Sequence, residues 1–277
     1  MTKLRILVTG SNGLIGRTFI ETYKKNYKIF KYTKRDDLGK ILKISRPEII
    51  FNTAGEQYNE KRMISSNLLI VEKLLNFWRK RNSYLISLGS SAEYGVCKFP
   101  TKENTLLKPA TKYEATKAAA SMLITGYSRA YDLNAIVIRP YAVYGVYNKP
   151  DRLIPKLINC IQKNGSMNIY RGYHDFIYVK DFVRGIKILI ENRHRWERGE
   201  VINLGSGKQL SNFQVLQFVK EIFGNKKGKF NLINKFFRKW DSNMWVCNPA
   251  HINKKYGFRT KFTFKKSLVD MKEKLTK

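Results

Sequence analysis

The chain has 277 residues, 43% of them hydrophobic, which suits one large α/β domain with a smaller appendage and excludes a disordered chain. It carries 53 Lys and Arg against 21 Asp and Glu, a net charge of +32, without a helix-turn-helix, zinc-finger or aromatic RNA-binding signature. We therefore assign the charge to scattered lysines of a lysine-rich proteome and to attraction for phosphate-bearing ligands, and expect no specific nucleic-acid partner.

Apolar segments and cysteines restrict the location of the protein. No run of about 18 uncharged apolar residues occurs, so we expect no membrane insertion. The apolar run after Met1 is too short for a signal peptide and leads straight into a glycine turn. Cys97, Cys160 and Cys247 are widely spaced and odd in number, which predicts neither a disulfide framework nor a metal site. We expect a cytoplasmic protein.

Strands and helices alternate along the first half of the chain. Continuous apolar runs, typical of buried parallel strands, predict strands at residues 5–9, 28–32, 48–52, 83–88 and 134–138. Helical spacing of apolar residues predicts helices from Gly16 onward and at residues 38–45, 64–79 and 112–131. This alternation predicts an α/β fold of the Rossmann type, a doubly wound parallel sheet with helices on both faces.

The alternation loosens beyond Gly145. We expect helices at residues 153–162, 179–191 and 211–223, and extended segments at residues 175–179 and 201–204. The predicted organisation is a dinucleotide-binding Rossmann domain over residues 1–147, to which residues 176–206 return. A smaller substrate-binding domain then covers residues 148–277.

The turn after the first strand carries three glycines at positions i, i+3 and i+6. The first permits a tight turn, the second lets backbone approach a pyrophosphate, and the third lets the next helix pack against the strand. The N–H groups at the start of that helix are free to bind phosphate. The sequence predicts that this loop holds a dinucleotide through Gly10, Ser11, Asn12, Gly13, Leu14, Ile15 and Gly16.

The end of the second strand discriminates between dinucleotides. An acidic residue there favours NAD(H), whereas a basic one accommodates the 2′-phosphate of NADP(H). Lys34 and Arg35 come first, and they predict NADP(H). Asp36 keeps NAD(H) open, and a solvated Lys-Arg pair is the alternative interpretation of these two residues.

Tyr113 and Lys117 stand four residues apart in a predicted helix, so they share one of its faces. A free tyrosine has a pKa of about 10, and a nearby ammonium lowers that pKa by favouring the phenolate. Ser90 or Ser91, at the end of a parallel strand, can hold a substrate oxygen against the tyrosine, because ligands of open α/β sheets bind at that edge. Tyr-x-x-x-Lys alone also occurs in ordinary cores. Together with the serines and the glycine loop, it predicts proton transfer beside a dinucleotide.

Further segments carry a family resemblance. Residues 139–145 read Arg-Pro-Tyr-Ala-Val-Tyr-Gly, residues 174–181 read His-Asp-Phe-Ile-Tyr-Val-Lys-Asp, and residues 203–207 read Asn-Leu-Gly-Ser-Gly. With the motifs above, the chain resembles, nearly end to end, the extended short-chain dehydrogenase/reductases that act on nucleotide sugars. The resemblance implies a catalytic triad of Ser90, Tyr113 and Lys117, because Ser90 lies four residues before Tyr94.

The same resemblance implies binding residues and an assembly. It adds cofactor contacts at Ala54, Asn67 and Pro140, and substrate contacts at Ser91, Glu93, His174, Arg238 and Asp241. Arg238 and Asp241 resemble a pair that holds the diphosphate and ribose of a nucleotide-diphosphate sugar. A solvated loop residue is the alternative interpretation of Glu93. A homodimer paired through the helices at residues 64–79 and 112–131 is implied by analogy.

Departures from the family pattern narrow the reaction. Ala142 replaces the usual phosphate-contacting asparagine, and His174 replaces the usual arginine. The 4,6-dehydratases carry an acidic residue two positions before the tyrosine of the serine loop, and fucose-synthase-like enzymes carry a cysteine there. This chain has Ala92 at that position, with Glu93 one residue off register, and most resembles the 4-keto-6-deoxy sugar reductases.

The resulting functional hypothesis is NADP(H)-dependent reduction of the C4 keto group of a nucleotide-linked 4-keto-6-deoxy sugar. Its setting would be deoxysugar biosynthesis for a surface polysaccharide such as lipopolysaccharide. One alternative is a nucleotide-sugar 4-epimerase with bound NAD. A second alternative is a non-catalytic dinucleotide-binding protein whose basic surface binds nucleic acid or a membrane.

Overall fold

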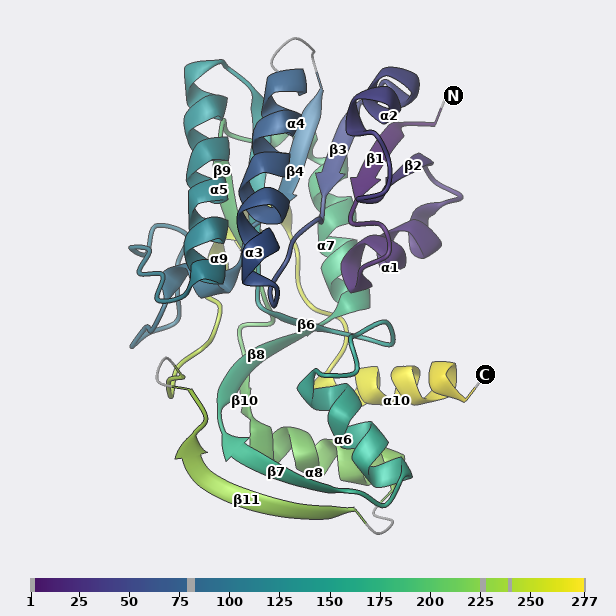
Figure 1. Cartoon of the computed structure of the whole chain (residues 1–277), viewed down its shortest axis with the longest axis vertical. Coiled ribbons are helices and arrows are strands. Elements are labelled where there is room, and N and C mark those ends of the chain that lie inside the picture. The colour runs from purple at the N-terminus through teal and green to yellow at the C-terminus, as the bar shows by residue number, and fades with distance from the viewer. Residues whose placement is uncertain (1–2, 79–82, 225–227, 239–240, 277) are drawn as a thin grey trace.

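A six-stranded parallel sheet forms the centre of the larger layer in the computed structural model, which describes residues 3–78, 83–224, 228–238 and 241–276 (Figure 1). The strand order is β2-β1-β3-β4-β5-β9, and every neighbouring pair is parallel. The strands are β1 (Arg5–Thr9), β2 (Lys28–Tyr32), β3 (Ile49–Asn52), β4 (Tyr84–Leu88), β5 (Asn134–Pro140) and β9 (Glu200–Leu204). The predicted doubly wound α/β fold is confirmed.

Helices cover both faces of this sheet. They are α1 (Leu14–Tyr23), α2 (Leu38–Ser45), α4 (Ile70–Trp78), α5 (Lys112–Ala130) and α7 (Val179–Glu191). Successive strand residues point to opposite faces, so Ile6 and Val8 join one core cluster with α1 and α7, whereas Leu7 joins another with α2, α4 and α5. Because both faces are buried, the strands are continuously apolar, which is why they were predictable.

The helix predicted at residues 64–79 is interrupted. The chain forms α3 (Glu60–Met63), then a π-helix η1 (Ile64–Leu69), then α4. Single turns of π-helix are rare and occur frequently at functional sites, and this one contains Asn67. Arg79, the predicted last residue, lies outside the described residues.

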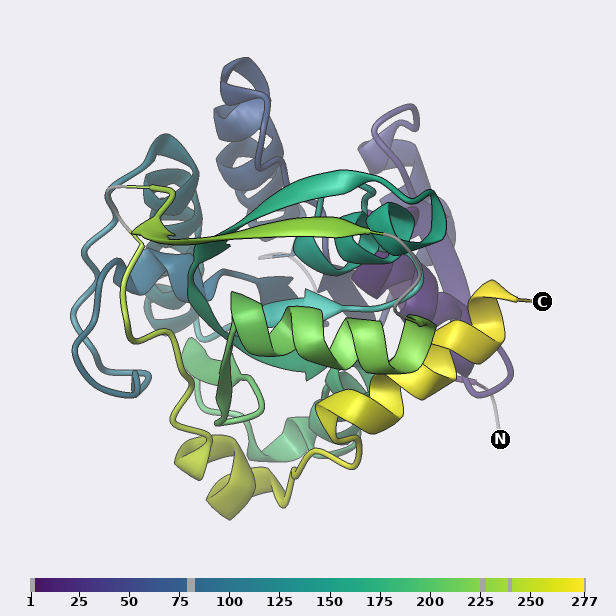
Figure 2. The ribbon, with the colours of Figure 1, turned by 90° about the horizontal axis from the view of Figure 1, so that it is seen from below.

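The smaller layer lies below the carboxyl edge of the large sheet (Figure 1). A three-stranded sheet has the order β10-β8-β6, and β7 pairs with β11. These strands are β6 (Ala142–Tyr144), β7 (Ser166–Arg171), β8 (Tyr173–Tyr178), β10 (Gln209–Ser211) and β11 (Lys229–Phe236). Helices α6 (Leu153–Gln162), α8 (Asn212–Phe223) and α10 (Phe264–Leu275) complete the layer, and Figure 2 shows α8 and α10 next to each other.

Segments late in the chain return to the large sheet. Strand β9 is its sixth strand, and α9 (Ala250–Tyr256) packs against β9, where the Tyr256 hydroxyl donates to Glu200 at 2.7 Å. Short 3-10 helices are η2 (Ser91–Tyr94) and η3 (Arg193–Arg195). The boundary at residue 147 stays a prediction, but residues beyond 206 also contact the Rossmann sheet. None of the described helices is long and apolar enough to cross a membrane.

Candidate active site

The glycine loop has the geometry of a phosphate-binding turn. Gly10 ends β1 with a φ of +64°, a conformation that side chains disfavour, and its carbonyl accepts from the Gly13 N–H at 2.9 Å. A Cβ on Gly16 would lie 2.6 Å from the Gly10 oxygen, so α1 approaches the turn too closely for a side chain. Gly13 caps α1 without a side-chain acceptor, which leaves first-turn N–H groups available to an anion.

The turn after β2 leaves its cations free and engages its carboxylates. The Asp36 carboxylate accepts from the Thr33 N–H at 2.6 Å and from the Thr33 hydroxyl at 2.8 Å, and these bonds lower the pKa of Asp36. Asp37 accepts from the Lys40 N–H at 3.1 Å as the cap of α2. Lys34 and Arg35 are exposed beside them. The Ser11 hydroxyl donates to the Tyr32 carbonyl at 3.4 Å, which joins this turn to the glycine loop.

Asn67 fixes the loop that follows β3. Its side-chain oxygen accepts from the Glu56 N–H at 2.8 Å, and its amide donates to the Glu56 carbonyl and the Thr116 hydroxyl. Ala54 lies at the start of that loop, with its N–H donating to Thr9 Oγ1 at 3.3 Å, and Pro140 ends β5 at the same edge of the sheet. The buried Asn67 amide is therefore bonded to protein groups through both its oxygen and its nitrogen.

The three predicted catalytic residues lie where β4 ends and α5 begins. Ser90 caps η2, and its hydroxyl oxygen accepts from the Ala92 N–H at 3.1 Å. Tyr113 and Lys117 are in the first two turns of α5, which starts in a capping box of Thr111 and Glu114. The buried Lys117 ammonium donates to the carbonyl of Leu88, the last residue of β4.

Burial shifts the pKa values of Tyr113 and Lys117 in opposite directions. Burial raises the pKa of Tyr113, and the Ser90 hydroxyl and the Arg152 charge oppose that rise. Burial lowers the pKa of Lys117 to about 8, and the Glu93 carboxylate opposes that change. Sequence reasoning expected Lys117 to activate Tyr113. In the structure the cation that acts on Tyr113 is Arg152, while Lys117 is bonded to the strand end.

Arg152 is a site residue that sequence reasoning missed. It caps α6 in the smaller layer, and its guanidinium donates to the side-chain oxygen of Gln57, in the loop after β3. The guanidinium carbon lies 5.6 Å from the ring centroid of Tyr58 in the same loop. No motif marks Arg152, because only the folding of the two layers brings it to this loop.

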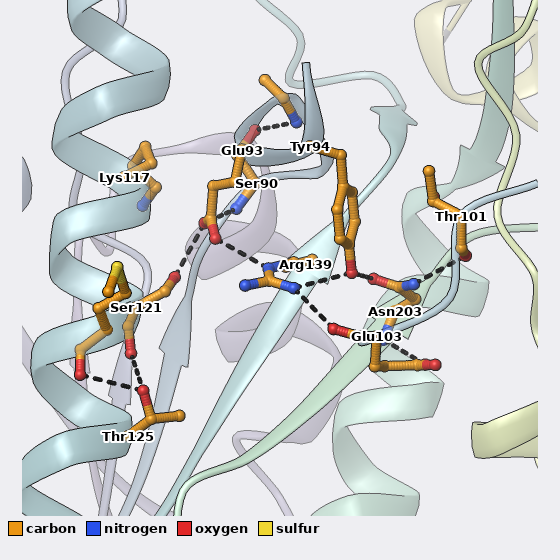
Figure 3. A network of polar contacts seen from close by, with 12 residues as sticks. Ser90, Glu93, Tyr94, Thr101, Glu103, Lys117, Ser121, Thr125, Arg139 and Asn203 are labelled. Atoms are coloured by element: carbon orange, nitrogen blue, oxygen red, sulfur yellow. Dashed lines mark hydrogen bonds and ion pairs between the residues drawn. The ribbon is translucent and has the colours of Figure 1, made fainter. Parts of the chain in front are cut away.

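Glu93 does not contact a substrate, and this prediction is corrected. Its side chain is 0% exposed, and its carboxylate forms an ion pair with Arg139 at 2.8 Å. The other oxygen accepts from the Ser90 N–H and the Ser121 hydroxyl (Figure 3). With every face covered by protein donors, the carboxylate has no surface left for a sugar hydroxyl. The alternative of a solvated loop residue is wrong for the same reason.

His174 on β8 interacts electrostatically with Arg238 and Asp241, which follow β11. Burial lowers the pKa of His174 to about 4, Asp241 opposes this, and Arg238 and Arg152 add to it. His174 is therefore neutral near pH 7 and cannot supply the charge of the arginine that it replaces. Arg238 is exposed, and its N–H donates to the Asp241 carboxylate at 2.9 Å.

Ser91 borders a small pocket beside η2. Its hydroxyl oxygen accepts from the Trp245 indole N–H at 3.2 Å. The pocket beside it is lined mainly by aromatic, sulfur and apolar side chains, including Cys97, Phe99, Met244 and Val246. Such a wall suits an apolar substituent of a ligand.

Comparison with known proteins relates this site to a family. A family model described as "NAD dependent epimerase/dehydratase family" matches residues 6–205. An uncharacterized UDP-glucose epimerase, YtcB of Bacillus subtilis, is 26% identical over 58% of this chain and 51% of its own length. The low-salt glycan biosynthesis protein Agl12 of Haloferax volcanii is 24% identical over 82% of this chain and 85% of its own length.

Solved structures share the fold. UDP-N-acetylglucosamine 4-epimerase from Methanobrevibacter ruminantium, in complex with UDP-N-acetylmuramic acid, has a TM-score of 0.89 at 20% identity and covers 100% of this chain and 99% of its own. The dTDP-glucose 4,6-dehydratase from Bacillus anthracis, in complex with NAD, has a TM-score of 0.86 at 23% identity. The match covers 98% of this chain and 96% of that chain.

Proposed function

The chain belongs to the NAD-dependent epimerase/dehydratase family, and from this premise we propose that it reduces the C4 keto group of a nucleotide-linked 4-keto-6-deoxy sugar with NADPH. One observation carries the choice of reaction. In residues 90–95, all of which the structure describes, the single acidic side chain is Glu93, and it is completely buried. This loop thus presents no carboxyl group for the elimination that a dehydratase performs.

The residues divide the reaction among them. When bound, the nicotinamide supplies hydride to the C4 carbon. The Ser90 oxygen accepts from Ala92, and its hydroxyl, which faces Tyr113, would donate to the C4 oxygen in the bound complex. Tyr113 donates a proton to the alkoxide that forms there, which yields the alcohol. Lys117, whose ammonium lies at the end of β4, would bind the nicotinamide ribose and supply positive charge.

Arg152 and Arg238 are suited to the diphosphate of the substrate. Both guanidinium groups act on His174 and on Tyr58, so they converge on one region of the cleft from α6 and from the segment after β11. Guanidinium groups bind phosphate oxygens in a bidentate manner. The pair would supply the positive charge that neutral His174 and Ala142 do not. Asp241, next to Arg238, would bind the nucleotide ribose.

The preference for NADP(H) rests on the turn after β2. Both of its carboxylates cap backbone N–H groups, and Lys34 and Arg35 are exposed. A 2′-phosphate would therefore meet two exposed cations, while Asp36 and Asp37 each have one carboxylate oxygen engaged by a backbone N–H.

Turnover tests this proposal directly. The purified protein is incubated with a panel of 4-keto-6-deoxy nucleotide sugars and either NADPH or NADH, and cofactor oxidation is followed by absorbance. We expect oxidation of NADPH with at least one sugar and none in the Tyr113→Phe variant. Absence of oxidation of both cofactors with every sugar refutes the reductase.

A 4-epimerase is the second candidate, favoured by the fold shared with a UDP-N-acetylglucosamine 4-epimerase. Such an enzyme oxidises C4 and then reduces the opposite face, so it has to retain its dinucleotide. NAD recovered from the purified protein, together with inversion at C4 of a UDP-sugar, would favour this candidate over the reductase.

The predicted homodimer also remains a proposal. Ile64 and Leu69 on η1 and Met122 on α5 are exposed apolar side chains, and η1 packs against α5. A dimer through these elements would bury them. Light scattering is expected to give twice the mass of the chain, and a lower mass in a Met122→Glu variant.

A further inference from the structure

Glu93 connects three elements of the active site. One carboxylate oxygen accepts from the Ser90 N–H at 2.7 Å and from the Ser121 hydroxyl at 2.9 Å. The other accepts from the Arg139 guanidinium at 2.8 Å (Figure 3). The three donors come from the loop after β4, from α5 and from β5. A single buried carboxylate therefore joins the loop of Ser90 to the helix that carries Tyr113 and Lys117.

The position of Ser121 makes this connection specific. Ser121 follows Lys117 by four residues, so it lies one helical turn below it on the same face of α5. Ser90 is the residue whose hydroxyl acts on Tyr113. The carboxylate thus sets the distance between the Ser90 loop and the catalytic face of α5.

Charge reinforces the geometry. Burial raises the pKa of Glu93, and Arg139, Lys117 and Ser121 oppose the rise. The two Glu93 oxygens accept from an N–H, a hydroxyl and the Arg139 guanidinium, and these donors favour the anion. In turn, Glu93 is the charged group that opposes the effect of burial on Lys117. Tyr113 is faced by Arg152, Glu93 and Glu114.

We propose that Glu93 is a positioning residue, which holds Ser90 against the catalytic helix and supplies negative charge to the buried Lys117 ammonium. The role concerns the proposed reduction and rests on it. Arg139 offsets the charge of Glu93 and is itself held by the Tyr94 hydroxyl at 2.8 Å and the Glu103 carbonyl at 3.2 Å. Without this guanidinium, a carboxylate at this depth would be strongly unfavourable.

Two variants remove the carboxylate. Glu93→Gln keeps the shape of the side chain but leaves Arg139 buried without its anion, which endangers folding. The double variant Glu93→Leu/Arg139→Leu removes both charges together with the acceptor oxygen that bonds Ser90 and Ser121, and it leaves no unpaired charge buried. Glu103→Gln is the matched control, because Glu103 accepts from the Asn203 N–H at 3.0 Å at the far end of the same network.

Two readouts are measured on each folded variant. The first is kcat and KM for the keto sugar with NADPH. The second does not need turnover: in protein labelled with 13C-lysine, the Cε resonance of Lys117 is followed against pH and is assigned by its loss in Lys117→Arg. Because burial lowers the pKa of Lys117 to about 8, its titration separates from those of exposed lysines.

We expect kcat to fall on the order of 100-fold in the double variant with little change in KM, as for a misplaced catalytic group. Lys117 should titrate at lower pH than in the wild type, and Glu103→Gln should match the wild type in both readouts. A wild-type kcat in the folded double variant overturns the proposal. If the wild type turns over no substrate, the proposed reduction is refuted, and the Lys117 titration still tests the role of Glu93. A Lys117 titration that is unchanged in the double variant overturns that role.

Discussion

Replacing Gly16 with alanine tests whether close packing of α1 on the glycine turn is required. A Cβ at this position would lie 2.6 Å from the Gly10 oxygen, 2.9 Å from Thr53 Oγ1 and 3.1 Å from the Cα of Ser11. The Thr53 side chain is held by the Thr9 carbonyl at 2.6 Å, so it cannot turn away freely. The added methyl group therefore has to displace the turn that contains Gly10.

The magnitude follows from two opposing terms. Alanine in a helix is more stable than glycine by about 0.5–1 kcal/mol. Forcing an extra methyl group into a packed site costs about 1–3 kcal/mol. Gly126 in α5 provides the control, since a Cβ there meets nothing within 4 Å and only the first term applies. The free energies of unfolding of the two variants should differ by about 1–3 kcal/mol. Each kcal/mol corresponds to a change in Tm of roughly 2–4 °C.

Cofactor affinity should follow the displaced turn. Loss of one charge-assisted hydrogen bond to a phosphate costs about 1.5–3 kcal/mol, which weakens binding by about tenfold or more. Differential scanning fluorimetry measures Tm, and titration calorimetry measures the Kd of NADPH. The reasoning is refuted if Gly16→Ala raises Tm as Gly126→Ala does and leaves that Kd unchanged.

Four further outcomes are expected. Tyr113→Phe should lower kcat by about 10²–10⁴-fold while the Kd of NADPH stays constant, because only the proton donor is removed. Since burial lowers the pKa of Lys117 to about 8, kcat/KM should fall as pH rises through that value and the ammonium loses its proton; a rate that is flat to pH 10 contradicts this role. Arg35→Gln should weaken NADPH binding by about tenfold and leave NADH binding unchanged, which fluorescence titration measures; equal losses for both cofactors would remove Arg35 from the 2′-phosphate site. Arg139→Met should lower the free energy of unfolding in urea by about 3–5 kcal/mol, because a buried carboxylate loses its cation. Arg5→Met, in an exposed pair with Glu48, should lower it by about 0–1 kcal/mol. Similar losses in the two variants would contradict the buried-pair argument.

Local patterns explain which parts of the fold were predictable. The bounds of β1, β2, α2, α6 and α7 agree with those expected from apolar periodicity, because each buries a face whose spacing is readable along the chain. Other elements lacked such a signal. Strand β11 pairs with β7 more than sixty residues earlier and is mostly exposed, so neither its partner nor its buried face is visible in the pattern. The π-helix η1 was read as regular helix because its apolar spacing resembles one.

The amino-acid sequence by itself predicted the cofactor loop and the catalytic roles of Ser90, Tyr113 and Lys117. Those predictions depend on short spacings along the chain, at a strand end and on one helix face. Such spacings do not depend on how distant segments pack. Only the tertiary structure decided that Glu93 is buried against Arg139 and that Arg152 reaches the loop of Gln57. These contacts join residues 46 and 95 positions apart, and they depend on how loops and layers meet. For the same reason, the charge beside Tyr113 comes from Arg152 of the smaller layer, which no local spacing could predict.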